Sequence, residues 1–259
     1  MSVIADRINL EISGTADGPP LILHHALGAC LDMWEPQLAV LESHFKLIRM
    51  DMRGHGKSLA PPSPYRIEDL ADDVVVVMDS LDVERCLFMG LSIGGMVGQS
   101  LTLNHPDRVE RLVISNTTSR MPVDLQPLWD KRIQAADSDG MDTQVEITLS
   151  RWFTQEYASN HRDVLDWISS MVRSTTPEGF IGCCHAIKHL DLTDQLCEID
   201  VPCLIVAGGQ DPGIPPQMSR DIHQQIAGSR LEIIEGAAHL SNVQTADEFN
   251  ALVVPFLTD

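Results

Sequence analysis

Short apolar runs alternate with helical patterns along the first part of the chain. The pattern predicts a helix over residues 67–81 and another over residues 94–103. Apolar strands that alternate with helices are typical of a mostly parallel sheet covered on both faces. The strands predicted in this part are an exposed one at residues 8–12 and buried ones at residues 20–23, 46–50, 86–89 and 112–115.

The alternation stops after residue 118. Residues 119–190 contain no convincing strand, but they hold three of the four tryptophans and helical patterns at 128–136, 143–152, 164–172 and 177–187. Strand and helix patterns then resume at 203–207, 216–226, 231–234 and 246–257. The sequence therefore predicts an α/β core made of residues 1–118 and 191–259, interrupted by a helical cap at residues 119–190.

Charge and cysteine content narrow the function classes. The chain of 259 residues has 18 basic and 37 acidic side chains and a net charge of −19, so it repels phosphate backbones and we expect no nucleic-acid partner. Because no signal-like start and no bilayer-length apolar run is found, we expect a cytoplasmic protein with no membrane partner. The six cysteines lack metal-ligand spacing, which favours buried thiols over disulfides or a metal site. Whether the chain forms a homo-oligomer is left open.

The strongest chemical signal is the sequence Gly90-Leu91-Ser92-Ile93-Gly94. It comes directly after the predicted strand at 86–89 and directly before the predicted helix at 94–103. This context is typical of a nucleophile elbow, in which a serine occupies a strained turn between a strand and a helix. The flanking glycines allow the backbone to bend sharply. Ser92 is therefore the predicted nucleophile.

A serine hydroxyl is a weak nucleophile and needs a base, which in turn needs an orienting acid. Asp211 follows the predicted strand at 203–207, and His239 follows the predicted strand at 231–234. Both residues thus leave the sheet at the edge where Ser92 is expected, in the order serine, acid, histidine. The alternatives with weaker context are the histidines His24, His25 and His55 and the acids Asp51 and Asp191. We interpret Asp51 as a turn-forming residue.

The oxyanion of a tetrahedral intermediate needs two hydrogen-bond donors. One is expected from the backbone N–H of Ile93, at the start of the helix. The other is expected from the loop after the strand at 20–23, and we assign it to the backbone N–H of Leu27. The predicted chemistry needs no metal and no cofactor.

The whole chain resembles α/β-hydrolases of the 3-oxoadipate enol-lactonase type. This resemblance implies an α/β-hydrolase fold and hydrolysis of a cyclic enol ester in aromatic catabolism, the β-ketoadipate pathway, without metal or cofactor. The segments that carry it are Leu27-Gly28 to Trp34, Asp51 to Ser58, Gly90 to Gln99, Arg108 to Thr117, Trp129 to Ile133 and His239 to Val243.

The sequence of the oxyanion loop differs from that of these lactonases, so the identity of the substrate stays undecided. His24-His25-Ala26 stands where small polar residues and a glycine are usual in these lactonases. A shared fold does not transfer a substrate, so a carboxylesterase or a different lactonase is the alternative. A non-catalytic ligand-binding relative is disfavoured because all three triad positions are filled.

Candidate substrate contacts come from the cap and from the oxyanion loop. They are His25, Trp129, Arg132 and Trp152, with core packing or a solvated surface as the alternative for each. An anionic substrate would need a local cation because the net charge of the protein opposes its binding. Arg132 is the first candidate for gripping a substrate carboxylate and Lys131 the second.

The assignment of the acid generates a first prediction. We expect Asp211→Asn to lower turnover by several orders of magnitude, because a neutral amide would hold His239 in the wrong tautomer. Asp51→Asn is expected to affect mainly stability. Ester hydrolysis and unfolding of both variants check this. A well-folded but inactive Asp51 variant beside an active Asp211 variant would show that the acid is misassigned.

Overall fold

The computed structural model describes residues 7–259, which contain one seven-stranded sheet. The strand order is β1-β3-β2-β4-β5-β6-β7, and only β1 runs antiparallel to its neighbour. The predicted mostly parallel sheet is thus present. The strands are β1 (Leu10–Gly14), β2 (Pro20–His24), β3 (Lys46–Met50), β4 (Cys86–Leu91), β5 (Val109–Ser115), β6 (Cys203–Gly208) and β7 (Arg230–Ile234).

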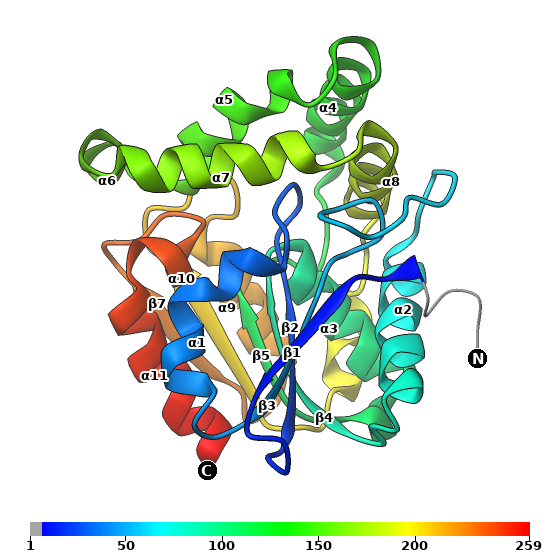
Figure 1. Ribbon diagram of the computed structural model, residues 1–259, viewed down its shortest axis with the longest axis vertical. Helices are drawn as coiled ribbons and strands as arrows, with labels where there is room; N and C mark the ends of the chain where they lie inside the picture. Colours follow the sequence, from blue (N-terminus) through cyan, green and yellow to red (C-terminus); the bar gives the residue numbers. More distant parts are fainter. Residues whose placement is uncertain (1–6) are drawn as a thin grey trace.

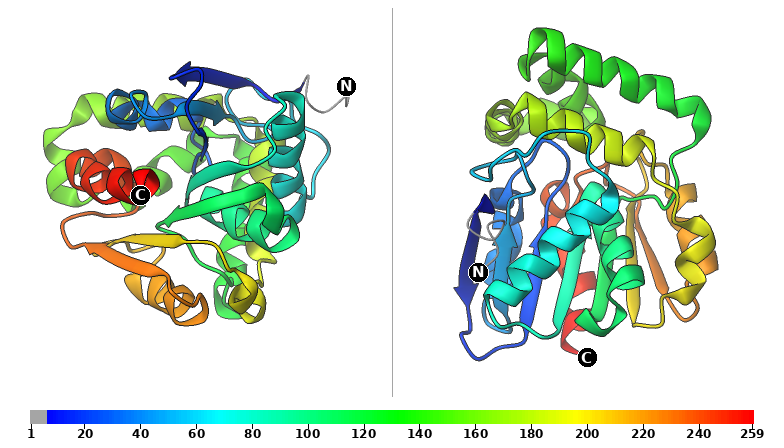
Figure 2. Two further views of the ribbon diagram at one scale, coloured as in Figure 1. Left: turned by 90° about the horizontal axis from the view of Figure 1, so that it is seen from below. Right: turned by 90° about the vertical axis from the view of Figure 1, so that its right-hand side faces the viewer.

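Helices cover both faces of the sheet. Figures 1 and 2 show α1 and α11 on one face and α2, α3 and α9 on the other. The helices of the core are α1 (Glu35–Leu41), α2 (Ile67–Ser80), α3 (Ile93–Asn104), α9 (Pro216–Gln225), α10 (Ser241–Gln244) and α11 (Ala246–Thr258). The helices between β5 and β6 are α4 (Gln126–Asp139), α5 (Asp142–Trp152), α6 (Gln155–Asn160), α7 (Arg162–Ser174) and α8 (Pro177–Lys188).

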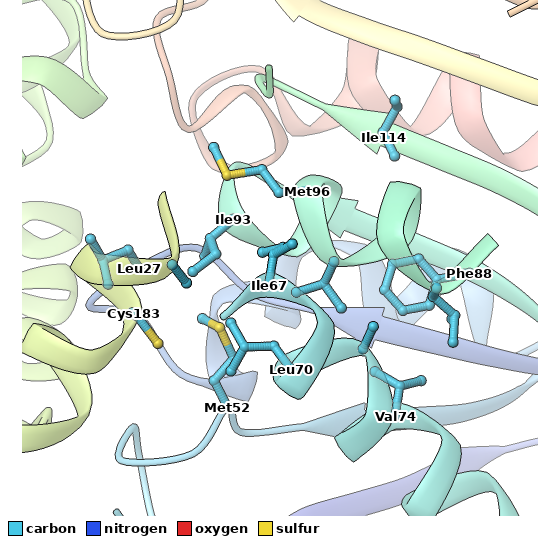
Figure 3. Packing of buried hydrophobic residues seen from close by; sticks show 14 of the residues in the cluster. Leu27, Met52, Ile67, Leu70, Val74, Phe88, Ile93, Met96, Ile114 and Cys183 are labelled. Carbon is cyan, nitrogen blue, oxygen red and sulfur yellow. The ribbon is translucent and has the colours of Figure 1, made fainter. Parts of the chain in front are cut away.

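The central strands are apolar throughout because each of their faces is buried. On β4, Phe88 belongs to the hydrophobic cluster under α2 and α3, whereas Leu87 and Met89 belong to the cluster under α1 and α11. Successive side chains of a strand point to opposite faces, so a continuous apolar run fills both clusters. Figure 3 shows Ile67, Leu70 and Val74 of α2 directed at this packing.

The helices α4 to α8 lie above the carboxyl ends of the strands (Figure 1). Trp152 and Ile168 join the cluster under α1 and α11, while Phe180 and Ile187 join the one under α2 and α3. These helices therefore pack on both halves of the core at the edge where Ser92 lies. The division at residues 119 and 190 stays a prediction about domains.

Several elements differ from the prediction. β1 lies two residues later than predicted, and its register against β3 pairs Leu10 with Met50 and Gly14 with Lys46. An edge strand has one exposed side, so its apolar pattern places it poorly. The short helices α1, α6 and α10 were not predicted, because four to seven residues are too few for a helical period. Of the six free cysteines, five are buried as expected, but Cys197 is exposed.

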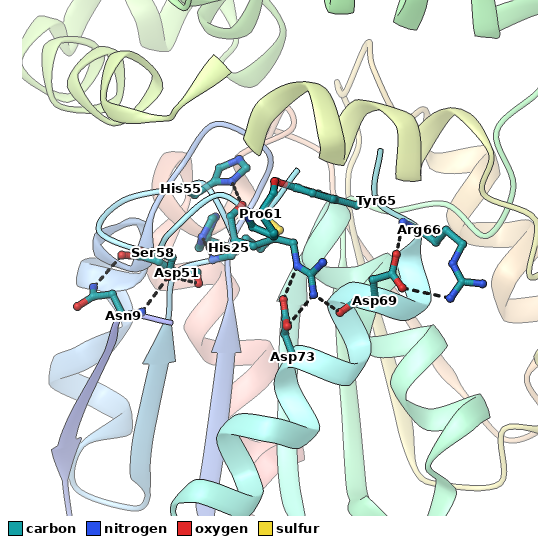
Figure 4. Close-up of polar contacts among 12 residues, drawn as sticks. Asn9, His25, Asp51, His55, Ser58, Pro61, Tyr65, Arg66, Asp69 and Asp73 are labelled. Atoms are coloured by element: carbon teal, nitrogen blue, oxygen red, sulfur yellow. Dashed lines mark hydrogen bonds and ion pairs between the residues drawn. The ribbon is translucent and has the colours of Figure 1, made fainter. Parts of the chain in front are cut away.

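Asp51 holds the loops beside β1 and β3 together (Figure 4). Its carboxylate accepts hydrogen bonds from the backbone N–H groups of Leu31 at 2.8 Å and Lys57 at 2.9 Å and from the side-chain amide of Asn9 at 2.7 Å. A carboxylate with three such donors is engaged in holding these segments together, in agreement with its interpretation as a turn-forming residue. No helix among residues 7–259 has both the length and the hydrophobicity needed to cross a bilayer.

The buried histidines His24, His25 and His55 predict a loss of stability on acidification. Burial lowers the pKa of His25 to about 4 and the pKa of His55 to about 3, and it also lowers the pKa of His24. The unfolded chain takes up protons at these rings below about pH 6.5 whereas the folded protein does not. As the pH falls from about 6.5 toward the pKa of a ring in the folded protein, that ring should lower the free energy of unfolding by about 1.4 kcal/mol per pH unit.

Urea unfolding between about pH 7.5 and about pH 5.5 measures this loss as a falling free energy of unfolding. A matched control is His189→Gln, which removes an exposed histidine in place of a buried one. A free energy of unfolding that stays constant over this range would contradict the role of the buried rings.

Candidate active site

Ser92 occupies the sharp turn between β4 and α3. Its backbone has φ 59° and ψ −118°, a conformation that L residues rarely adopt. A Cβ at Gly94 would collide with the backbone oxygen of His24, and one at Gly90 would collide with the backbone of Gly94. Only glycine at these two positions lets α3 pack this close to β2 and β4. The turn places the Ser92 side chain at the carboxyl edge of the sheet.

His239 and Asp211 form a hydrogen-bonded pair at the same edge. Nδ1 of His239 lies 2.6 Å from Oδ2 of Asp211, whose side chain is 0% exposed. Oδ1 of Asp211 accepts the backbone N–H groups of Gly213 at 2.8 Å and Ile214 at 2.9 Å. Burial alone would raise the pKa of Asp211, but the His239 charge and these hydrogen bonds outweigh it and hold the pKa below its usual range. An ionised acid can thus orient the imidazole.

Asn116 is a further partner of this pair that the sequence analysis missed. It follows β5 with a positive φ of 46°, and its Nδ2 donates to Oδ2 of Asp211 and to the backbone oxygen of Ala238, both at 3.1 Å. The Ser241 hydroxyl donates to its Oδ1 at 2.6 Å, which fixes the orientation of the amide. Buried polar groups that satisfy one another in this way rigidify a site.

Two backbone amides lie where oxyanion donors are expected. The N–H groups of Gly95 and Met96 donate to the Ser92 backbone oxygen, but within residues 7–259 the N–H groups of Ile93 and Leu27 have no hydrogen-bond acceptor. Figure 3 shows Leu27 and Ile93 at the same end of the packed cluster. Free amides at a helix start favour negative charge.

A pocket joins these groups. It is lined by Leu27, Ser92, Met96, Trp129, Arg132, Thr148, Arg151, Trp152, Ile187, Gly213, Ile214 and His239. Ser92 and His239 thus line the same pocket, although no hydrogen bond joins their side chains in the part of the chain described. Hydrogen bonds of this kind often tighten only when a substrate is bound.

Three of the predicted cap contacts, Trp129, Arg132 and Trp152, line this pocket. The ring of Trp152 lies 6.2 Å from that of His239, centroid to centroid, so this tryptophan forms part of the wall beside the candidate base. Trp129 lies under the Arg132 guanidinium, 5.2 Å from it.

Two expected contacts must be corrected. His25 is fully buried and away from the pocket: its Nδ1 bonds the backbone oxygen of Ala26 at 2.8 Å, and its Nε2 accepts the N–H of Met52 at 2.9 Å. With both ring nitrogens engaged it has no group to offer a substrate. Lys131 is exposed and does not line the pocket.

The second cation in the pocket is Arg151, on α5, which the sequence analysis did not single out. Its position depends on how α5 packs, and no local pattern signals that. Asn116 could have been found, because it directly follows a predicted strand at the edge that carries the other candidates.

The chain is similar to known proteins along most of its length. A family model described as the alpha/beta hydrolase fold matches residues 19–246. The chain is 33% identical to 3-oxoadipate enol-lactonase 2 of Acinetobacter baylyi over 95% of this chain and 91% of that protein.

Two solved structures are similar over nearly the full chain. The enol-lactonase from Burkholderia xenovorans LB400 has a TM-score of 0.94 and 38% identity, with 97% of this chain and 96% of that chain covered. A thermophilic esterase from Thermogutta terrifontis, solved with malate bound, has a TM-score of 0.91 and 25% identity, with coverages of 96% and 92%.

The place of Asn116 generates a prediction about turnover. We expect Asn116→Gly to lower kcat about 10- to 150-fold, because a hydrogen bond to a charged group is worth about 1.5–3 kcal/mol. Glycine accepts the positive φ without strain, so the loss reports the missing donor and not the backbone. The lower-pH limb of the rate profile should also move to higher pH, because Asn116 is one of the donors that hold the pKa of Asp211 below its usual range.

Steady-state kinetics over a range of pH check both effects. Asn104→Ala is the matched control, since the Asn104 side chain lies at the far end of α3 and, among residues 7–259, donates to Ser100 alone. Asn116→Asp should be slower still, because a second carboxylate would repel Asp211. Unchanged kcat and an unchanged profile in the glycine variant would make Asn116 a merely structural residue.

Proposed function

The chain belongs to the alpha/beta hydrolase family, in which it resembles the 3-oxoadipate enol-lactonases, and we propose that it is a serine hydrolase that cleaves a lactone or carboxylic ester. The observation that carries the proposal is the hydrogen-bonded pair of Asp211 and His239 in the pocket that Ser92 also lines. An acid, an imidazole and a serine hydroxyl around one pocket are the groups that acyl transfer needs.

The reaction proceeds through an acyl-enzyme. The Ser92 hydroxyl attacks the carbonyl carbon while His239 takes its proton, and the N–H groups of Leu27 and Ile93 stabilise the oxyanion. His239 then protonates the leaving alcohol or enol. Water activated by the same imidazole attacks the acyl-enzyme and releases Ser92. With an enol-lactone the leaving enol stays tethered, so the product is a single open-chain keto acid.

The proposed substrate is an enol-lactone of aromatic catabolism, of the 3-oxoadipate enol-lactone type. The enol-lactonases of Acinetobacter baylyi and Burkholderia xenovorans support it at 33% and 38% identity. Arg132 is proposed to bind the carboxylate of such a substrate. The second candidate is a carboxylesterase, and the similar fold of the malate-bound esterase supports it.

We expect Ser92→Ala to abolish turnover and labelling by a fluorophosphonate probe while the fold is retained. Loss of a triad nucleophile costs on the order of a million-fold in rate. Ser159→Ala is the matched control, because Ser159 lies exposed on α6. Activity of the Ser92 variant within about tenfold of the wild type would refute the serine mechanism.

A substrate panel separates the two candidates. It contains an enol-lactone that bears a carboxylate, saturated lactones and p-nitrophenyl esters. The enol-lactonase is supported if kcat/KM is highest for the enol-lactone, and the carboxylesterase is supported if simple esters are preferred. A panel without any turnover would count against both.

A further inference from the structure

Two arginines face the pocket in which the proposed chemistry takes place. Arg132 lies on α4 and Arg151 on α5, and both line the cavity together with Ser92 and His239. Within residues 7–259, neither guanidinium has a carboxylate within 4.0 Å, whereas Arg173, on the neighbouring α7, is paired with Asp142. The pocket thus holds two unpaired cations in a protein whose net charge is −19.

Arg132 is held in place by neutral groups. Its Nε donates to Oε1 of Gln144 at 3.1 Å, and its guanidinium carbon lies 5.2 Å from the ring centre of Trp129 and 5.1 Å from that of Phe180. These contacts fix the plane of the guanidinium without neutralising it, and they leave its Nη donors available. Burial lowers the pKa of Arg132, and the charge of Arg151 lowers it further.

Arg151 approaches the pocket from the side of the acid loop. Its Nε and Nη2 lie 3.4 Å from the position that a Cβ would take on Gly213, in the loop that carries Asp211. The absence of a side chain at Gly213 leaves this space to the guanidinium. Trp152, the next residue, forms the wall beside His239, so Arg151 is held next to the catalytic pair by the same turn of α5.

Two like charges held close together are unfavourable, and removing them from water adds to the cost. The carboxylate near Arg151, that of Asp211, is already engaged by His239, Asn116 and the loop amides. An anion bound between them offsets both terms. Planar guanidinium groups match a carboxylate in geometry and can bind it through paired hydrogen bonds. Thr148, also in the pocket wall, adds a hydroxyl.

We propose that Arg132 and Arg151 together form an anion subsite that binds a carboxylate of the substrate, at a distance from the carbonyl that Ser92 attacks. The inference rests on the proposed function. It specifies that the substrates of the proposed hydrolase are lactones or esters that carry a free carboxylate. The subsite adds Arg151 to Arg132 as a residue that determines substrate specificity. The subsite also gives a −19 protein the local positive field that an anionic substrate needs.

The test compares two esters that differ in charge, p-nitrophenyl hydrogen succinate and p-nitrophenyl butyrate. Arg151→Gln should lower kcat/KM for the succinate ester at least about tenfold more than for the butyrate ester, mainly through KM. Arg132→Gln should do the same, and the double variant should lose the preference for the charged ester. Arg132→Lys keeps the charge but not the paired hydrogen bonds, so it should lie between the wild type and Arg132→Gln.

Arg173→Gln is the matched control. It removes a cation from the same group of helices, but its side chain lies outside the pocket and pairs with Asp142, so both esters should be hydrolysed as by the wild type. Equal losses on the two esters in the Arg132 and Arg151 variants would overturn the subsite while leaving the serine hydrolase in place.

A binding measurement tests the subsite without turnover. Calorimetric titration of the Ser92→Ala protein with succinate should show binding that weakens at least about tenfold when Arg151→Gln is added. Succinate binding that is absent, or indifferent to both arginines, would overturn the inference. Binding by these arginines in a protein that hydrolyses no ester would support the subsite and refute the proposed function, so the two failures are distinguishable.

Discussion

At Ser92 the chain leaves β4 with a positive φ and enters α3 after a single residue, and this turn sets the position of most of the site. It requires α3 to approach the end of β2 so closely that Gly94 has no room for a side chain. The same approach brings the loop after β2, with Leu27, next to the first turn of α3. The strained serine and the two free amides are therefore consequences of one packing constraint.

The acid and the base depend on the sheet in a different way. Asp211 and His239 follow β6 and β7, and Asn116 follows β5, so three neighbouring parallel strands end beside one another. The buried carboxylate remains ionised because backbone amides, an asparagine and the imidazole all donate to it. Removing any one donor leaves a buried charge less compensated, which is why these contacts are coupled.

The sequence predicts the fold class, which is confirmed, because buried parallel strands are continuous apolar runs and the elbow has its own motif. The triad roles stay predictions that the geometry supports. The prediction that His25 contacts the substrate is wrong, although Leu27 of the same loop does line the pocket. The direction of an imidazole in a loop depends on tertiary contacts, here the hydrogen bond from the Met52 N–H, which the sequence does not reveal. Arg151 was missed for a similar reason, since only the packing of α5 turns it inward.

The proposed catalytic groups and the proposed substrate contacts lie on separate parts of the chain. The groups proposed to attack the substrate, to accept the proton and to bind the oxyanion all belong to strand ends and loops of the core, whereas the tryptophans and arginines of the pocket belong to α4 and α5. The two sets meet through side-chain packing, such as that of Trp152 against His239, and through the hydrogen bond from the Leu240 N–H to the backbone oxygen of Trp152. Substitutions on α4 and α5 can therefore change the charge and shape of the pocket without altering the hydrogen bonds of the core. The chain is similar over nearly its full length both to proteins known as enol-lactonases and to a protein known as an esterase, so the fold alone does not select the substrate.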